Sequence, residues 1–83
     1  MKNLSKRLFG LRKTAGLSMV EVSTRSRKLR HEHAHVTQGY ISRLESGRER
    51  NPSLGKLVSL AHIYGVSLND LVGGYPQKGG NNG

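Results

Sequence analysis

Short helical segments separated by glycines and helix-capping residues are the feature that most constrains the fold of this chain. Gly16, Gly47 and Gly65 each follow a segment with apolar residues at helical spacing, in the position where glycine ends a helix. Serine or threonine stands near the start of the segments that follow, where its side chain can accept a hydrogen bond from a free backbone amide. The pattern predicts an all-α chain whose short helices are stable only when packed together.

The spacing of apolar residues predicts where the first three helices lie. The first extends from Asn3 to about Ala15. The second begins after Ser18, which can form a capping box with Glu21. The third is Gln38 to about Ser46, after the cap Thr37. Either the second helix or the turn after it is unusually long, because an inner stripe continues beyond Ser26 to about Ala34 through Val22, Ser26, Leu29 and His33.

Two further helices complete the expected five-helix domain. The fourth is Ser53 to Tyr64, and a short fifth helix follows the cap Ser67. We expect one domain over residues 1–75 and a disordered tail over residues 76–83, whose glycine- and asparagine-rich composition cannot bury enough surface. The residues expected to face the core from these two helices are Leu54, Leu57, Val58, Ala61, His62, Leu68, Leu71 and Val72.

The charge of the chain points to an anionic partner. Its 83 residues include 14 Lys and Arg against 5 Asp and Glu, a net charge of +9, and most of the basic residues lie in the first 50 positions. Nucleic acid and an anionic membrane surface both attract such a chain. The absence of cysteine excludes disulfides and thiolate sites. No apolar run has membrane-spanning length and the start lacks a secretory signal, so we expect a soluble cytoplasmic protein without a membrane partner.

Several motifs together resemble the Cro and phage-repressor family of helix-turn-helix domains, also called Xre-like. They are Gly16-Leu17-Ser18 and the run from Tyr40 to Gly47, in family order and spacing. The resemblance covers about residues 4–72 and continues through the segments 51–54, 57–61 and 65–71. It implies that the third helix lies in the major groove of DNA and that the second crosses the phosphate backbone.

The resemblance also assigns roles to individual residues. The implied base contacts are Gln38, Gly39, Ser42 and Arg43, which are otherwise ordinary exposed helix residues. It implies a structural ion pair between Arg12 and Glu45, which leaves Glu45 without a catalytic role. The implied phosphate contacts, which otherwise form a solvated basic face, are Thr37, Tyr40, Arg48, Arg50, Arg25, Arg27, Lys28 and Arg30.

The chain departs from the family pattern at two places. Met19 stands where family members usually have a glutamine that touches a phosphate. Additional residues near Arg27 to Ala34 lie between the second and third helices, and they either embrace the DNA backbone or displace the turn.

The added segment also contains three histidines. If it is helical, His31 and His35 share a face at a spacing that suits two-point metal ligation, with His33 and Glu32 between them. The alternative, which we prefer, is a polar surface that gains charge below about pH 6.5. His62 is expected to be a core histidine, and we expect no metal and no other cofactor.

The expected function is sequence-specific DNA binding by a transcription regulator. We expect a repressor that acts as a homodimer on an operator, and no enzyme, because the sequence has no paired carboxylates, phosphate-binding glycine loop or nucleophile with a base. One alternative is an antitoxin-like module that binds a protein partner and its own promoter. Another is a basic module that binds RNA or membrane surfaces. Apolar candidates for the dimer contact, which can equally belong to the core, are Val66, Leu68, Leu71, Val72 and Tyr75.

Overall fold

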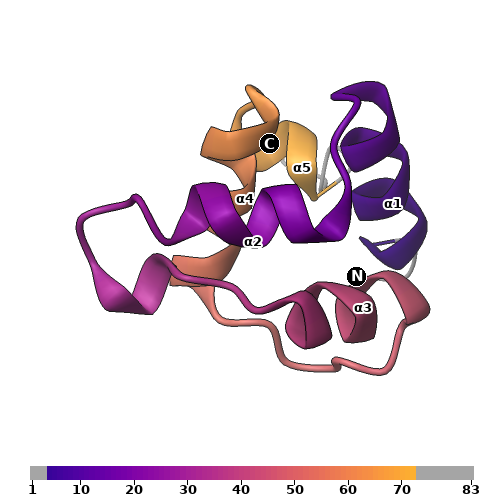
Figure 1. Cartoon of the computed structure of the whole chain (residues 1–83). Coiled ribbons are helices and arrows are strands. Elements are labelled where there is room, and N and C mark those ends of the chain that lie inside the picture. The colour runs from indigo at the N-terminus through magenta and orange to yellow at the C-terminus, as the bar shows by residue number, and fades with distance from the viewer. Residues whose placement is uncertain (1–3, 73–83) are drawn as a thin grey trace, which may run out of the picture.

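The computed structural model describes residues 4–72 as an all-helical domain, and no strand occurs in that range. Its α-helices confirm the expected fold class (Figure 1). Tyr75 and the expected tail over residues 76–83 lie outside the described residues. In chain order the elements are α1 (Leu4–Thr14), α2 (Met19–Ser26), the 3₁₀ helix η1 (Glu32–Ala34), α3 (Gln38–Ser46), α4 (Leu54–Tyr64) and α5 (Leu68–Leu71).

Local capping interactions set the bounds of these helices. The Ser18 hydroxyl accepts from the Glu21 amide while the Glu21 carboxylate accepts from the Ser18 amide, so the expected capping box is present. Gly47 and Gly65 end α3 and α4 with φ of 80° and 71°, a left-handed conformation that glycine adopts without steric cost. The side chains that cap the starts of α3, α4 and α5 are Thr37, Ser53 and Ser67.

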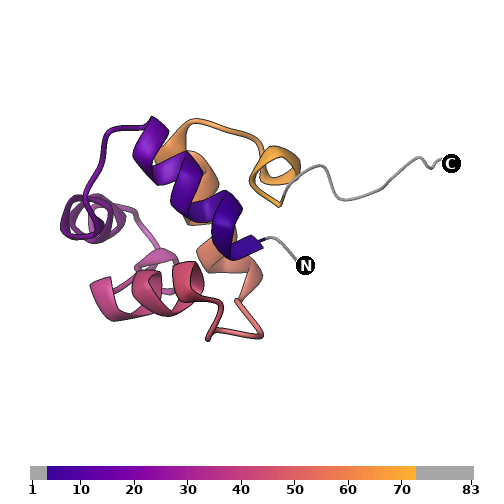
Figure 2. The same cartoon turned by 90° about the vertical axis from the view of Figure 1, so that its right-hand side faces the viewer.

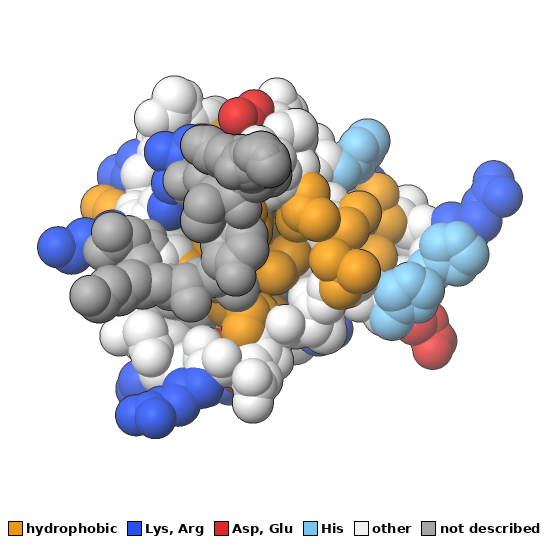
Figure 3. Space-filling view, turned by 180° about the vertical axis from the view of Figure 1, so that it is seen from behind, with side chains coloured by type: hydrophobic (Ala, Val, Ile, Leu, Met, Phe, Trp, Pro, Cys, Tyr) orange, Lys and Arg blue, Asp and Glu red, His pale blue; other side chains and the backbone are white. Residues whose placement is uncertain are grey.

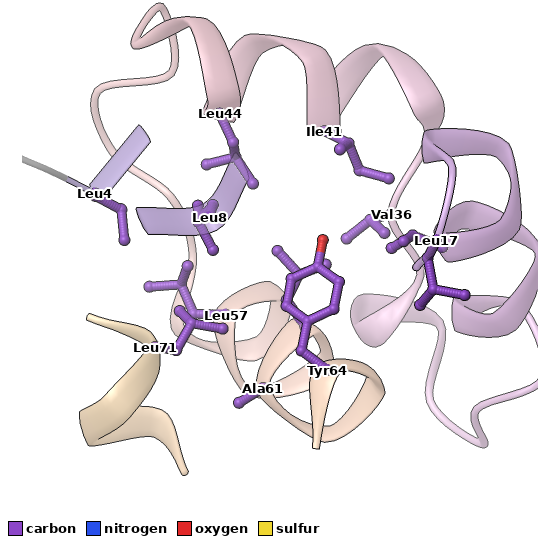
Figure 4. Close-up of a cluster of buried hydrophobic side chains, with 12 residues drawn as sticks. Leu4, Leu8, Leu17, Val36, Ile41, Leu44, Leu57, Ala61, Tyr64 and Leu71 are labelled. Atoms are coloured by element: carbon purple, nitrogen blue, oxygen red, sulfur yellow. The ribbon is translucent and has the colours of Figure 1, made fainter. Parts of the chain in front are cut away.

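One apolar core joins all the helices. α1 packs against α3 and α5, and α4 packs against α2, α5 and η1 (Figures 1 and 2). Tyr64 points from α4 into the middle of the buried side chains (Figure 4). The most deeply buried apolar residues are Leu8, Val22, Val36, Ile41, Leu60 and Leu71.

The lengthened part of the chain is the turn after α2 and not a continuation of that α-helix, which settles the alternative left open by the sequence. α2 ends at Ser26, and residues 27–36 form a connector that contains η1 (Figure 1). The Ser26 hydroxyl donates to the carbonyl of Ser23 at 2.8 Å and accepts from the amide of Val36 at 2.9 Å. Val36 is only 1% exposed, so this bond closes the connector at the edge of the core.

The prediction that Leu54, Val58 and His62 face the core is wrong. Leu54 is 64% and Val58 49% exposed, and His62 is also exposed. α4 buries the face formed by Leu57, Leu60, Ala61 and Tyr64 instead. The three exposed residues repeat every four positions, so they form a second stripe along the helix, beside the buried one.

A first prediction concerns two of the buried serines, Ser26 at the end of α2 and Ser59 on α4. Ser26→Ala should lower the free energy of unfolding by about 1 to 3 kcal/mol, because the buried amide of Val36 then lacks a partner. Ser59→Ala is the matched control, since the Ser59 hydroxyl is buried with no hydrogen-bond partner in the described part of the chain. Urea titrations of both variants measure the difference, and equal stabilities would contradict the proposed bond.

A second prediction concerns Tyr64, whose hydroxyl is buried and unpaired among residues 4–72. Burial, followed by the charge of Glu45, raises the pKa of Tyr64 above its usual value of 10. Above pH 10 the unfolded chain ionises this phenol while the folded chain keeps it neutral, so stability falls as the pH rises. In the Tyr64→Phe variant the free energy of unfolding should fall less steeply above pH 10 than in the wild type, by up to about 1.4 kcal/mol per pH unit. Unfolding titrations at about pH 9 and 11 test this, and parallel pH profiles would refute it.

Candidate nucleic-acid interface

A buried ion pair fixes the orientation of α3 against α1. Arg12 Nε donates to Glu45 Oε2 at 2.7 Å, and Arg12 Nη2 donates to Glu45 Oε1 at 2.9 Å. The side chains are only 8% and 5% exposed, and the bond to Glu45 raises the pKa of Arg12. Arg12 Nη1 also donates to the carbonyl of Leu17 at 2.9 Å. One side chain therefore connects α1, the turn before α2, and α3.

The first turns of α3 carry the side chains expected to contact bases. Ile41 and Leu44 are buried on the inner face of the helix, whereas Gln38 and Gly39 are exposed and Ser42 is half-buried. At Gly39 an added Cβ would meet only Arg43 and Thr37 side-chain atoms, at 3.7 and 3.9 Å. These are ordinary van der Waals distances, so packing within the protein does not require glycine at this position.

Arg43 also lies on the outer face of α3, but neighbouring side chains hold it. Its Nε lies 3.5 Å from Glu49 Oε1, and its guanidinium lies 5.6 Å from the centre of the Tyr40 ring. Glu49 reaches this position because its amide and that of Arg48 both donate to the carbonyl of Arg43. The sequence analysis did not identify Glu49, since only the folded loop after α3 brings it to Arg43.

The expected phosphate contacts on and after α3 have different surroundings. The Thr37 hydroxyl accepts from the Tyr40 amide, and the Tyr40 hydroxyl accepts from the Ser53 amide at 3.3 Å. Arg48 Nε donates to Ser46 Oγ at 3.1 Å, and Arg50 is exposed. Thr37 and Tyr40 thus form hydrogen bonds within the protein and are also at least partly exposed.

The remaining expected phosphate contacts lie at the other end of α3. Arg25 is exposed on α2 and interacts with the Glu21 carboxylate, whose pKa is lowered first by hydrogen bonds with Ser18. The connector leads into the N-terminus of α3 (Figure 1), so basic residues precede and follow that helix in the chain. Three side chains of the connector are exposed and form no hydrogen bond or ion pair within the described range, namely those of Arg27, Lys28 and Arg30.

The histidines do not have the helical arrangement considered from the sequence. His31 and His35 do not share a helix face, because this part of the connector is not an α-helix. The rings of His31 and His33 are stacked with centroids 5.2 Å apart, and His35 Nε2 donates to the carbonyl of Leu29 at 3.0 Å. Among residues 4–72, no three His, Cys, Asp or Glu side chains gather where they could hold a metal ion.

Lys56 and Gly55 dock the connector onto α4, a role that the sequence analysis missed. Lys56 Nζ donates to the carbonyl of His35 at 2.9 Å and lies 5.5 Å from the centre of the Tyr40 ring. A Cβ at Gly55 would lie 2.8 Å from His33 Cδ2, which is too close. Met19, the departure from the family pattern in α2, is half-buried and packs against the core.

The described part of the chain contains no helix that is long and apolar enough to cross a membrane.

Comparison with known proteins gives the same family as the motifs. A family model described as Helix-turn-helix matches residues 10–71. The HTH-type transcriptional regulator DdrOP3 of Deinococcus deserti is 38% identical over 71 residues, which cover 86% of this chain and 48% of that protein. The chain thus spans about half the length of this curated relative. No solved structure matches the chain.

A third prediction tests whether the buried ion pair determines the position of α3. Arg12→Ala and Glu45→Ala should each lower the free energy of unfolding by roughly 3 to 5 kcal/mol, because each leaves a buried charge without its partner. The double variant should lose much less than the sum of the two. Denaturant titrations of the four proteins give the coupling energy, and a coupling energy of zero would contradict the assignment.

Proposed function

This chain belongs to the helix-turn-helix family, and from that membership we propose that it is a transcription regulator that binds double-stranded DNA sequence-specifically through α3. In this proposal α3 lies in the major groove and α2 crosses the phosphate backbone. Regulation is by occupation of an operator, with repression as the expected outcome. No catalytic step is part of the proposal.

The observation that carries the proposal is the exposed polar edge of α3 on a helix whose other face is held in the core. Gln38 can form two hydrogen bonds with adenine, and Arg43 can form two with guanine. Packing within the protein does not require glycine at position 39. Because Gly39 has no side chain, a base or sugar can approach the backbone closely there. Ser42 lies one turn further along the same edge and can donate to or accept from either kind of base.

Basic residues that precede and follow α3 in the chain support a phosphate-positioning role. Arg48 and Arg50 follow its C-terminus, while Arg27, Lys28 and Arg30 precede its N-terminus. Contacts of this kind fix the register of a protein on DNA and make its affinity depend on salt. Arg25, Thr37 and Tyr40 complete the proposed phosphate contacts.

We further propose that the protein binds a two-fold operator as a homodimer. Leu71 is fully buried and belongs to the core, so it cannot reach a second copy. Three other apolar residues near α5 are only partly buried, and they are the candidates for this contact among the described residues: Val66, Leu68 and Val72.

A fourth prediction separates base contacts from phosphate contacts. Arg43→Ala should flatten the preference at one base pair, where a bidentate contact discriminates by about 1 to 3 kcal/mol. Arg50→Ala should weaken all sequences alike and make the salt slope shallower by about one unit. The measurement is a titration of every single-base variant of a selected operator at two salt concentrations.

Two results would contradict these assignments. If Arg43→Ala and Gln38→Ala both preserve the whole base-preference profile, α3 is not the recognition helix. If the wild-type protein neutralises six phosphates, its log-log salt slope is about −5, and a slope near zero would exclude DNA binding.

A further inference from the structure

An apolar groove lies between α4 and the connector, and of the residues in the proposed DNA interface only Arg30 lines it. Its volume is about 490 Å³. Figure 3 shows apolar side chains gathered there, with histidines beside them, on the face opposite to the view of Figure 1. No residue of α3 lines the groove. The apolar part of the lining comes from Leu29, Ala34, Leu54 and Val58.

The floor of the groove exposes side chains that are normally covered. Leu54 and Val58 are 64% and 49% exposed, and they are one helical turn apart on α4. Leu29 and Ala34 of the connector extend this apolar strip across the groove. Adjacent large apolar side chains on a surface with polar edges mark sites of protein interaction.

The rim of the groove is polar and carries one cation, Arg30. Arg30, His31, His33 and His62 line it, and no Asp or Glu is among the lining residues of the described chain. The chain as a whole carries a net charge of +9. A complementary occupant therefore carries carboxylates on either side of an apolar strip.

No described helix of this sequence is such an occupant, because none carries more than one carboxylate. Three of its five acidic residues already have partners: Glu45 with Arg12, Glu21 in the capping box and Glu49 with Arg43. A second copy packed groove to groove would bring one Arg30 close to the other. Residues 73–83, which follow the described part, contain no acidic residue.

We propose that this groove binds an acidic amphipathic helix of another protein. Apolar side chains of that helix, spaced by one turn, pack on Leu54 and Val58, as in other helix-in-groove complexes. Carboxylates beside them face Arg30 and the histidines of the rim. None of the residues proposed to contact bases lines the groove, so the exposed edge of α3 stays accessible when this helix is bound, and only Arg30 is shared with the proposed phosphate contacts.

The test uses the wild-type protein and a stapled helical peptide with leucines on one face and glutamates beside them. Amide chemical shifts of the labelled protein should move saturably, and the movement should centre on the connector and the first turns of α4. A matched peptide with lysine in place of each glutamate should bind at least about tenfold more weakly, because its lysines meet Arg30 and a chain of net charge +9.

Surface variants then locate the site. Leu54→Ser combined with Val58→Ser should weaken binding of the acidic peptide by about tenfold, through loss of apolar contact. Val20→Ser is the matched control, because Val20 is 54% exposed on α2, and it should leave binding unchanged. All the replaced side chains are exposed, and thermal unfolding monitored by circular dichroism verifies that each variant is folded.

Four results would overturn the proposal. The first is the absence of saturable shifts, and the second is equal binding of the acidic and basic peptides. The third is unchanged binding by the double variant, which would place the peptide on the basic surface elsewhere. The fourth is occupation of the groove by the chain itself, seen as shifts of the groove residues that depend on protein concentration or are caused by deletion of residues 73–83.

Discussion

The buried pair of Arg12 and Glu45 is the interaction on which the proposed interface depends. The guanidinium uses three of its N–H groups, two for the carboxylate and one for the carbonyl of Leu17. Burial of two charges is costly, and such a pair often contributes little more stability than apolar residues of similar size. Its role here is geometric, because it fixes the relative positions of α1, the turn before α2, and α3. The orientation of Gln38 and Arg43 on the surface follows from that arrangement.

The connector adds residues between α2 and α3 without separating the two helices. α2 and α3 remain in contact, although residues 27–36 lie between them in the sequence. The hydrogen bonds between Ser26 and Val36 close the connector next to the core, and Lys56 holds the carbonyl of His35 from the α4 side. The exposed middle of the connector can therefore carry cations and form one wall of the groove while its ends stay fixed.

The features that could be predicted from the sequence are mainly those set by residues close together in the chain, such as helix caps and helix bounds. The capping serines and the glycines after α3 and α4 act within a few positions, and the helix bounds deduced from them agree closely with the structure. The end of α2 was harder to place, because Ser26, Leu29 and His33 have helical spacing. In the structure α2 ends at Ser26, whose hydroxyl accepts from the amide of Val36, ten residues further along the chain.

The same limitation explains the misplaced stripe on α4 and the missed roles of Lys56 and Glu49. Leu54, Leu57, Val58 and Ala61 fit two overlapping stripes, and only the packing of α2, α5 and η1 around α4 decides which one is buried. The role of Lys56 comes from its hydrogen bond to a backbone carbonyl of the connector, and such a carbonyl leaves no pattern in the sequence. Roles that depend on contacts between distant parts of the chain became visible only in the fold.

The contact of Glu49 with Arg43 bears on how α3 would read a base. The two side chains are 48% and 24% exposed and their closest atoms are 3.5 Å apart, so solvent screens the pair. Exposed pairs of this kind contribute about 0 to 1 kcal/mol, whereas a bidentate contact of arginine with guanine discriminates by about 1 to 3 kcal/mol. Glu49 therefore does not prevent Arg43 from contacting a base in the proposed complex. Together with the Tyr40 ring it restricts the conformations of the free arginine, which lowers the entropy that Arg43 loses on binding.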